Sequence, residues 1–315
     1  MVLHPQAKAA LARWAEGPHV SDPGFGQADI DRQRRLALEE AAAEPREHVD
    51  RVEDVDADGV PCRLYRPSSV DPVASVEPEA SVEPVETTGV VVFLHGGGFV
   101  FGDLDTHDAQ ARRIANRTGL AVLAVGYRRP PEHRFPAAPD DVDTALAWLA
   151  ANAAPAGLDL SRLVALGDSA GGNLALVAAL RHPNLFAATV LVYPFIDPRM
   201  RFDSHRGDMG GLMAGEAAWY WRQYAGSPDD LEHPDLGPID SPRLGTLPPT
   251  LVVAAEHDIL VDEAVELVHR ARQVGADVEL STYRGMVHGF WRHPAMFDAA
   301  EESLAEIARF LRLVP

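Results

Sequence analysis

A serine held between glycines is the first feature of this 315-residue sequence that could do chemistry. The stretch "GDSAGGN" places Ser169 between Gly167 and Gly171. It follows an apolar, strand-like run over residues 162–167 and precedes a helical pattern over residues 173–182. A serine on so tight a strand-to-helix turn takes a strained backbone and exposes its hydroxyl, and the flanking glycines remove clashes. The pattern therefore indicates a nucleophilic serine.

A serine hydroxyl becomes a good nucleophile only when a base takes its proton, and a third group usually orients that base. After a strand–turn–helix serine of this kind, the acid and the histidine follow in that chain order, each on a loop after a later strand. Asp258 comes directly after the apolar run 250–257, and His288 follows the strand-like run 277–283. We therefore expect Ser169, Asp258 and His288 to form a catalytic triad.

The neighbouring histidines and acids are weaker candidates for these roles. His269 lies in the middle of a predicted helix, and His257 would turn away from a site that the next residue faces. His293 is expected on a surface loop. Asp262 and Glu263 start the helix that follows the acid, where carboxylates commonly cap a helix and are favoured by its dipole. We expect a capping role for both.

Three consecutive glycines, Gly96 to Gly98, follow another strand-like run and leave a loop without side chains. Attack by a serine on an ester creates an oxyanion that must meet preorganised backbone donors. We expect these donors to be the N–H groups of Gly97, Gly98 and Ala170, the residue after the serine. A dinucleotide-binding loop does not fit, because its third glycine would fall where Phe101 stands.

Two neighbours of these residues are candidates for supporting roles. His95 precedes the glycines and could steady their loop through its ring. Asp168 precedes the serine and could tune the field of the site. A structural histidine and an aspartate that caps the following helix are the simpler interpretations.

Composition excludes several other classes of function. The formal charge of −19 argues against binding to nucleic acid or to anionic membranes. Lys8 is the only lysine, so phosphate-binding loops and Schiff-base chemistry lack their lysine. Cys62 is the only cysteine, which excludes an intramolecular disulfide and a cysteine-based zinc site. We expect no cofactor and no metal. Without a signal-like segment or an apolar run of about 18 residues, the sequence predicts a cytoplasmic protein.

Short apolar strands alternate with helical segments from Val90 onward, which indicates an α/β fold with a mostly parallel sheet covered on both faces. Two further parts are helical, residues 1–48 and an insertion at residues 198–245 that is too long for a simple crossover. We expect these two parts to form a cap over the strand ends. The catalytic core then comprises residues 49–197 and 246–315, with a flexible acidic loop at residues 68–89.

The motifs together resemble a known family. "HGGGFVFGD", "YRRPPEHRFPAAPDD", "GDSAGGN", "HDILVDE" and "HGF" occur in the order typical of the hormone-sensitive lipase family of α/β-hydrolases, the bacterial family IV esterases. The resemblance covers roughly residues 90–290. It implies hydrolysis of short- to medium-chain carboxylic esters without a cofactor, and an oxyanion hole formed by Gly97, Gly98 and Ala170. Homodimerisation through the edge of the last strand is also common in this family.

The chain departs from the family pattern at two positions. Ile259 stands where a proline usually follows the triad aspartate, and Pro130 replaces an alanine within the "YR…PE" block. Ile259 could alter how the acid loop is held. Glu132 and His133 match that block and are expected to make structural contacts. The aromatic residues Trp219, Tyr220 and Trp221 could line an acyl pocket, but are expected mainly to join cap and core.

Three alternative functions use the same residues. An amidase or peptidase would share the triad and differ only in its leaving group. A ligand-binding module is the second alternative, because the family includes a plant hormone receptor that lost the triad histidine, whereas His288 is present here. A true lipase is the third, although the acidic composition and the lack of an interfacial amphipathic helix disfavour it.

Overall fold

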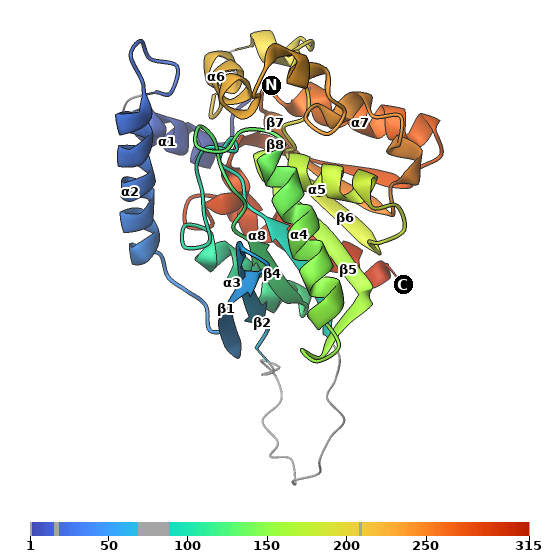
Figure 1. The fold of residues 1–315 in the computed structure, drawn as a ribbon. Coiled ribbons are helices and arrows are strands. Elements are labelled where there is room, and N and C mark those ends of the chain that lie inside the picture. Colours follow the sequence, from blue (N-terminus) through green and yellow to red (C-terminus); the bar gives the residue numbers. More distant parts are fainter. Residues whose placement is uncertain (1, 16–18, 69–87, 208–209, 315) are drawn as a thin grey trace.

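An eight-stranded sheet runs through the molecule, with helices on both of its faces (Figure 1). The computed structural model describes the whole chain apart from residues 1, 16–18, 69–87, 208–209 and 315. The strands are β1 (Arg51–Ala57), β2 (Val60–Arg66), β3 (Thr88–Leu94), β4 (Ala121–Val125), β5 (Leu158–Asp168), β6 (Ala188–Val192), β7 (Thr250–His257) and β8 (Val278–Val287). Their order across the sheet is β1-β2-β4-β3-β5-β6-β7-β8.

Most of this sheet is parallel. β1 pairs antiparallel with β2, and β2 pairs antiparallel with β4, whereas every other neighbouring pair is parallel. The residues of β4 and β6 are all buried, which explains why these strands appear in the sequence as continuous apolar runs rather than alternating ones. The predicted α/β-hydrolase fold, with a mostly parallel central sheet between helices, is confirmed.

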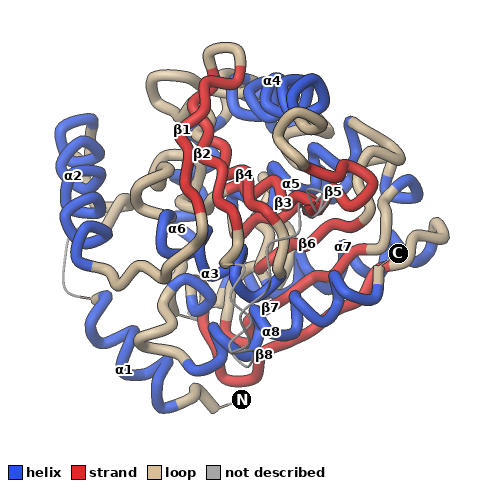
Figure 2. The backbone as a smooth tube through the Cα atoms, turned by 90° about the horizontal axis from the view of Figure 1, so that it is seen from below, coloured by secondary structure: helices blue, strands red, loops and turns tan. Residues whose placement is uncertain are grey.

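Helices cover the two faces of the sheet in separate apolar layers (Figure 2). On one face lie α4 (Ala137–Asn152), α5 (Ala170–Arg181) and α7 (Val261–Gln273). On the other lie α3 (Asp108–Thr118) and α8 (Asp298–Leu313), which also contact each other. Because both faces are covered, the parallel strands leave only their ends open for a site.

Several predicted boundaries shift in the structure. The loop expected at residues 68–89 lies mostly outside the described residues, and its last two residues, Thr88 and Gly89, belong to β3 instead. They pair with Leu158 and Asp159 of β5, so backbone pairing overrides the turn-like composition there. β8 extends beyond the predicted run to Val287 and therefore delivers His288 directly at its end. β1 and β2 form a hairpin that turns at Asp58 and Gly59, both of which have positive φ.

The two segments expected to form a cap are in contact with each other and with the glycine loop. They contribute α1 (Pro5–Trp14), α2 (Gln27–Ala43) and α6 (Ala214–Tyr224), together with the short 3₁₀ helices η1 (Ser204–Arg206), η2 (Pro228–Glu232), η3 (Pro238–Asp240) and η4 (Leu244–Thr246). Phe25 packs edge-on against Trp219 of α6 at 5.6 Å. Arg34 of α2 donates to the carbonyl oxygens of Val100 at 2.9 Å and Pro130 at 2.8 Å. The helical segments are therefore tied to the loop that carries the candidate site.

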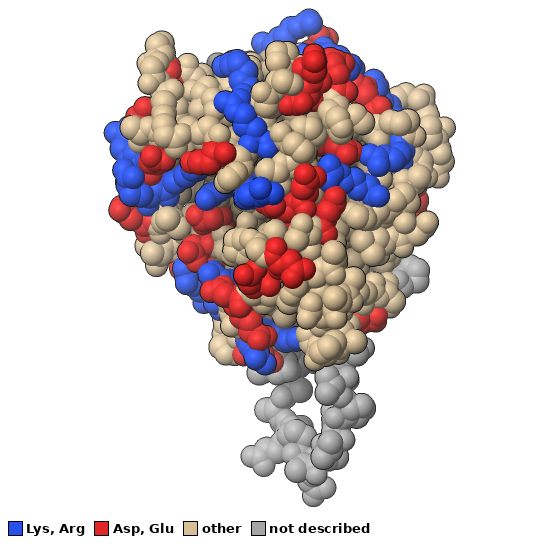
Figure 3. Space-filling view, in the orientation of Figure 1, with Lys and Arg blue, Asp and Glu red and all other residues tan. Residues whose placement is uncertain are grey.

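Charged side chains of both signs lie side by side on the face drawn in Figure 3. Ion pairs join charges of opposite sign in the described chain, as between Arg181 and Asp235 at 2.9 Å and between Arg181 and Asp143 at 2.7 Å. In the described part of the chain, no helix is both long and apolar enough to cross a membrane.

Candidate active site

Ser169 occupies a strained turn between β5 and α5. Its backbone has φ 54° and ψ −118°, a conformation that non-glycine residues rarely adopt. The chain passes so closely here that a Cβ atom on Gly167 would lie 2.1 Å from the carbonyl oxygen of Gly171. A Cβ on Gly171 would lie 1.9 Å from the carbonyl oxygen of Leu94. Both glycines of the motif are therefore required by backbone contacts around the serine.

The structure brings Ser169, His288 and Asp258 into one hydrogen-bonded chain. The Oγ atom of Ser169 lies 3.0 Å from Nε2 of His288, and Nδ1 of His288 lies 2.7 Å from Oδ2 of Asp258. Asp258 is fully buried, and its other oxygen accepts the N–H of Leu260 at 3.0 Å. An ionised Asp258 accepts a proton-bearing Nδ1, which leaves Nε2 free to accept the serine proton. This arrangement can deprotonate the serine.

The surroundings of His288 favour its charged form. Burial lowers the pKa of the imidazole, but the charge and hydrogen bond of Asp258 outweigh burial, and Asp168 and Glu216 add to the effect. The net result is a raised pKa. A base with this property holds a proton from the serine more readily than an isolated histidine would.

The glycine loop adopts a backbone that only glycine adopts without strain. Gly97 has φ 112°, and a Cβ there would lie 2.3 Å from the carbonyl oxygen of Phe101. Gly98 has φ 59°, and a Cβ there would meet the ring of Tyr220 at 2.2 Å. The N–H groups of Gly97, Gly98 and Ala170 donate to no acceptor among the described residues. They remain available to an acceptor that enters the site.

These elements meet in one cavity of about 210 Å³. Ser169, His288, Gly97 and Gly98 line it together with residues from the insertion and from the segment after β8. The further lining residues are Asp168, Tyr193, Phe195, Gly211, Leu212, Glu216, Tyr220, Gly289, Arg292 and His293. Within the described residues, no group of three or more His, Cys, Asp or Glu side chains is placed to hold a metal ion.

Asp168 holds the glycine loop rather than capping the helix after Ser169. Its Oδ1 atom accepts the N–H of Gly96 at 3.0 Å, and no side chain caps α5. The expected capping role was wrong because the carboxylate lies beneath the glycine loop, where a Cβ on Gly96 would lie 2.4 Å from it. Burial raises the pKa of Asp168.

His95 also contacts the glycine loop through its ring. Nδ1 of His95 lies 2.9 Å from the carbonyl oxygen of Gly96, and the ring stacks on Tyr127 at 4.3 Å. Burial lowers the pKa of His95 to about 3, so the ring is neutral at physiological pH. These contacts fit the supporting role considered from the sequence.

Two other sequence-based expectations also fail. His293 does not lie apart on a surface loop: it is half-buried, lines the cavity and packs against Trp14 at 5.4 Å. Glu263 does not cap α7. It is completely buried and accepts the backbone N–H groups of Ile196 at 2.6 Å and Asp197 at 2.9 Å. In both cases, contacts with distant segments determine the environment of the side chain.

The other histidines and acidic residues weighed from the sequence, whether as base, as acid or for a structural contact, are not among the residues that line the cavity. His269 is within α7, as expected, and His257 does not line the cavity. Asp262 accepts the N–H of Ser204 at 3.0 Å and so reaches the insertion. Glu132 forms an ion pair with Arg34 at 2.8 Å, the kind of structural contact expected for it.

The three aromatic residues of α6 considered from the sequence divide between two roles. Trp219 packs on Phe25 of the N-terminal segment, and Trp221 packs on Phe195, which follows β6, at 4.1 Å. Both therefore hold the insertion against other parts of the chain. Tyr220 lines the cavity above Gly98.

Sequence reasoning missed several residues that line the cavity, among them Tyr193 and Glu216. Tyr193 follows β6 directly, lines the cavity and places its ring 4.6 Å from that of His288. Its position at the carboxyl end of a central strand was a signal that could have identified it. Glu216 enters the cavity from α6 and lies 3.2 Å from Nδ1 of His19. No motif in the sequence marks Glu216.

The sheet, the strained serine turn and the histidine–aspartate pair together define an α/β-hydrolase. A family model described as "alpha/beta hydrolase fold" matches residues 91–292. The chain is 34% identical to the ethyl acetate hydrolase of Pseudomonas putida over 264 residues, which cover 82% of this chain and 79% of that protein.

Solved structures give the same result. A hyperthermophilic esterase from the archaeon Pyrobaculum calidifontis superposes with a TM-score of 0.85 at 33% identity, covering 99% of this chain and 98% of that one. An esterase from the bacterial hormone-sensitive lipase family superposes with a TM-score of 0.82 at 27% identity, covering 100% and 99% of the two chains. The chain belongs to the hormone-sensitive lipase family of α/β-hydrolases.

Proposed function

We propose that this chain is a serine carboxylesterase that hydrolyses short- to medium-chain carboxylic esters through an acyl-enzyme intermediate. The hydrogen-bonded chain from Ser169 through His288 to Asp258 carries the proposal. The relatives named as esterases and as an ethyl acetate hydrolase support carboxylic ester hydrolysis as the class of reaction.

In the first half of the reaction, Ser169 Oγ attacks the ester carbonyl while its proton passes to Nε2 of His288. The N–H groups of Gly97, Gly98 and Ala170 form the oxyanion hole that receives the negative oxygen of the tetrahedral intermediate. Asp258 stabilises the imidazolium ion that forms. The intermediate then breaks its bond to the alcohol oxygen, and the alcohol leaves with the proton from His288.

In the second half, water attacks the acyl group on Ser169. His288 takes a proton from the water, and the same N–H donors hold the second oxyanion. Cleavage of the bond to Ser169 Oγ releases the carboxylic acid, and His288 returns its proton to the serine. Each cycle therefore restores the starting protonation states without a cofactor.

The cavity supports small acyl groups. Its volume of about 210 Å³ is below the range of roughly 300–1,000 Å³ that is usual for sites of larger ligands. Tyr220, Phe195 and Leu212 give it apolar walls, as an alkyl chain requires. A cavity of this size supports a preference for acyl chains of short to medium length.

A series of p-nitrophenyl esters from acetate to palmitate tests this function. We expect kcat/KM to be highest for short or medium chains and to fall steeply toward palmitate, because the cavity cannot enclose a long chain. Matched p-nitroanilides of the best acyl group should react far more slowly. Faster turnover of the anilide would favour an amidase, and inactivity toward all substrates would favour a binding module.

Gly97 tests the proposed oxyanion hole. We expect Gly97→Ala to lower kcat by about 100- to 1,000-fold, because the added Cβ clashes with the Phe101 carbonyl and must displace the loop donors. Gly119→Ala is the matched control, since Gly119 also has positive φ but has no atom within 4 Å of its would-be Cβ. Equal kcat values for both variants would place the oxyanion hole elsewhere.

We also propose that residues 1–48 and 198–245 form one cap over a core of residues 49–197 and 246–315. The contact of Phe25 with Trp219 and that of His19 with Glu216 support this division. Homodimerisation through β8 is a further proposal. β8 ends the sheet and pairs with no strand other than β7 in the described residues, and apart from the bond that the N–H of His4 donates to the carbonyl oxygen of Gly285 at 3.0 Å, its outer edge is the one we propose to meet a second copy.

A further inference from the structure

The loop that carries Asp258 is a tight turn. The N–H of Val261 donates to the carbonyl oxygen of Asp258 at 3.1 Å, and Leu260 has φ −89° and ψ 1°. These values are those of the third residue of a type I turn, which makes Ile259 the second residue. Proline is favoured at that second position because its ring fixes φ in advance. Here Ile259 leaves the turn without that restraint.

A serine from the insertion holds this turn from outside. Oγ of Ser204 donates to the carbonyl oxygen of Ile259 at 2.6 Å, and the N–H of Ser204 donates to Oδ2 of Asp262 at 3.0 Å. Ser204 is buried and belongs to η1, 55 residues before Ile259 in the chain. The two bonds restrain the turn at Ile259, next to Asp258, and at Asp262, at the start of α7.

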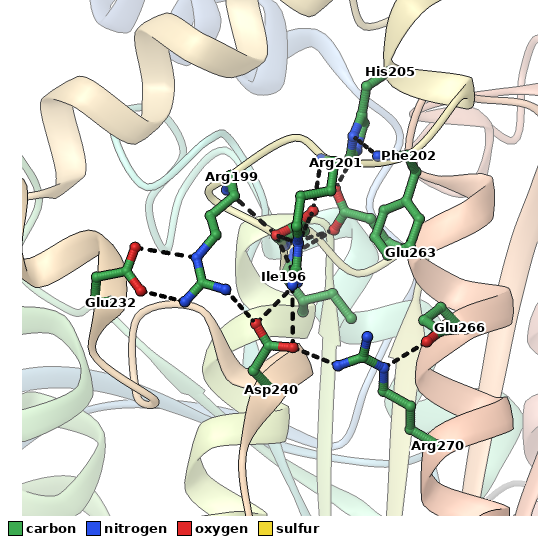
Figure 4. A network of polar contacts seen from close by, with 11 residues as sticks. Ile196, Arg199, Arg201, Phe202, His205, Glu232, Asp240, Glu263, Glu266 and Arg270 are labelled. Carbon is green, nitrogen blue, oxygen red and sulfur yellow. Dashed lines mark hydrogen bonds and ion pairs between the residues drawn. The ribbon is translucent and has the colours of Figure 1, made fainter.

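Glu263 contacts, from α7, His205 of the insertion and the two residues just before the insertion, Ile196 and Asp197 (Figure 4). Its buried carboxylate accepts the N–H groups of Ile196 and Asp197 and lies 2.7 Å from Nε2 of His205. His205 is the residue after Ser204, and it too is buried. The acid turn and the first residues of the insertion are therefore joined by bonds from both sides.

A chain of surface ion pairs lies beside this junction in Figure 4. Asp240 contacts Arg199 and Arg201, and it also pairs with Arg270 of α7. Glu232 pairs with Arg199 at the outer end of the network. Exposed pairs of this kind contribute little individually, so the buried bonds of Ser204 and Glu263 are the restraints that matter for the turn.

We propose that Ser204 and Glu263 are positioning residues that hold the turn 258–261 and thereby orient Asp258 toward His288. The proposal rests on the proposed function only in taking His288 as the base, since it concerns how the aspartate–histidine contact is maintained. It assigns to the insertion a role in the reaction besides enclosing the substrate. The hydroxyl of Ser204 supplies the restraint that a proline at position 259 would provide.

The test compares Ser204→Ala, Ile259→Pro and the double variant. Loss of the Ser204 hydroxyl should let the turn that carries Asp258 move. The carboxylate of Asp258 would then stabilise the charged form of His288 less. We expect the pKa of the His288 imidazole, followed by NMR titration and assigned with His288→Gln, to fall in Ser204→Ala. The double variant should recover most of the fall. Ile259→Pro alone is the reference for the double variant. Both exchange a buried isoleucine for a smaller side chain, so the effect of that exchange can be subtracted.

Kinetics provide the second readout. In Ser204→Ala we expect kcat to fall about tenfold or more, since misplacing a catalytic group by about 1 Å can cost up to 100-fold, while KM stays within about twofold. The acid limb of the kcat profile should move to lower pH. Ser303→Ala is the matched control, because Ser303 is a buried serine whose hydroxyl also donates to a backbone carbonyl, that of Ala300. That variant should leave both readouts unchanged.

The outcomes separate this proposal from the proposed function. An unchanged His288 pKa and an unchanged acid limb in folded Ser204→Ala would overturn the positioning role. The positioning role would also be overturned if Ser303→Ala shifted the His288 pKa and the kcat profile as much as Ser204→Ala does. The same holds if the double variant recovered none of the fall in the His288 pKa. If Ser204→Ala does not fold, Glu263→Gln weakens the junction from the other side, because it removes the charge that faces His205, and should give smaller shifts in the same direction. A wild type that hydrolyses no ester would remove the proposed function, whereas the NMR titration would still decide the positioning role.

Discussion

Replacing Ser169 with alanine is expected to lower kcat by up to about 10⁶-fold. The variant lacks the Oγ atom that lies 3.0 Å from Nε2 of His288 in the cavity lined by Gly97 and Gly98, so no acyl-enzyme can form. Substrate binding should change little, because the oxygen contributes little to the apolar walls of the cavity. The measurement is single-turnover and steady-state hydrolysis of the best p-nitrophenyl ester by both proteins.

Residual activity in this variant should come from the oxyanion donors and from substrate binding alone. A suitable control is Ser241→Ala, since Ser241 is also buried but does not line the cavity. The control should retain wild-type kcat. Turnover by Ser169→Ala within tenfold of the wild type would show that the nucleophile is another residue.

Replacing Asp258 with asparagine is expected to lower kcat by about 10⁴-fold. The asparagine amide can donate to Nδ1 of His288, which would move the imidazole proton to Nε2 and leave no base facing Ser169. The geometry of the site should be preserved, because the two side chains have the same shape. The effect is therefore one of tautomer and charge rather than of packing.

The pH profile gives this prediction a second check. The reaction requires neutral His288, so kcat/KM of the wild type should fall as the pH drops through the pKa of this residue. Asp258 raises that pKa despite burial. In Asp258→Asn the pKa should fall, and the acid limb should move to lower pH. Asp277→Asn, at an exposed site before β8, is the control. An acid limb that stays in place in Asp258→Asn would contradict the proposed role of the aspartate.

The sequence could predict those parts of the site that depend on local backbone geometry. Gly167 and Gly171 are needed because backbone atoms approach within about 2 Å of where their Cβ atoms would be, and such a need is visible as a glycine motif. The same holds for Gly97 in its loop. The order of strands and helices then places Ser169 and His288 at the same end of the sheet.

Other parts depend on segments that are distant in the chain. Glu263 has the sequence position of a helix cap, yet its carboxylate contacts Ile196 and Asp197, 67 and 66 residues away. Asp168 likewise has the position of a cap but binds Gly96, 72 residues away. Residue type and spacing alone do not distinguish a cap from a buried acceptor, because only the packing of the whole fold decides which donors are near.

The cavity walls were the least predictable part. Glu216 and His293 enter the cavity from segments whose path over the sheet has no periodic signature. Residues 1–48 and 198–245 contain few long helices and several 3₁₀ turns, whose placement depends on contacts such as that of Phe25 with Trp219. The chemistry of the site was therefore predictable to a greater extent than its substrate pocket.

Covalent labelling tests the central claim most directly. The purified protein is treated with diisopropyl fluorophosphate, digested and analysed by peptide mass spectrometry, while ester hydrolysis is followed in parallel. We expect a single adduct on Ser169, formed in step with the loss of activity, and no adduct in Ser169→Ala. An adduct on another residue, or complete loss of activity while Ser169 remains unmodified, would contradict Ser169 as the nucleophile.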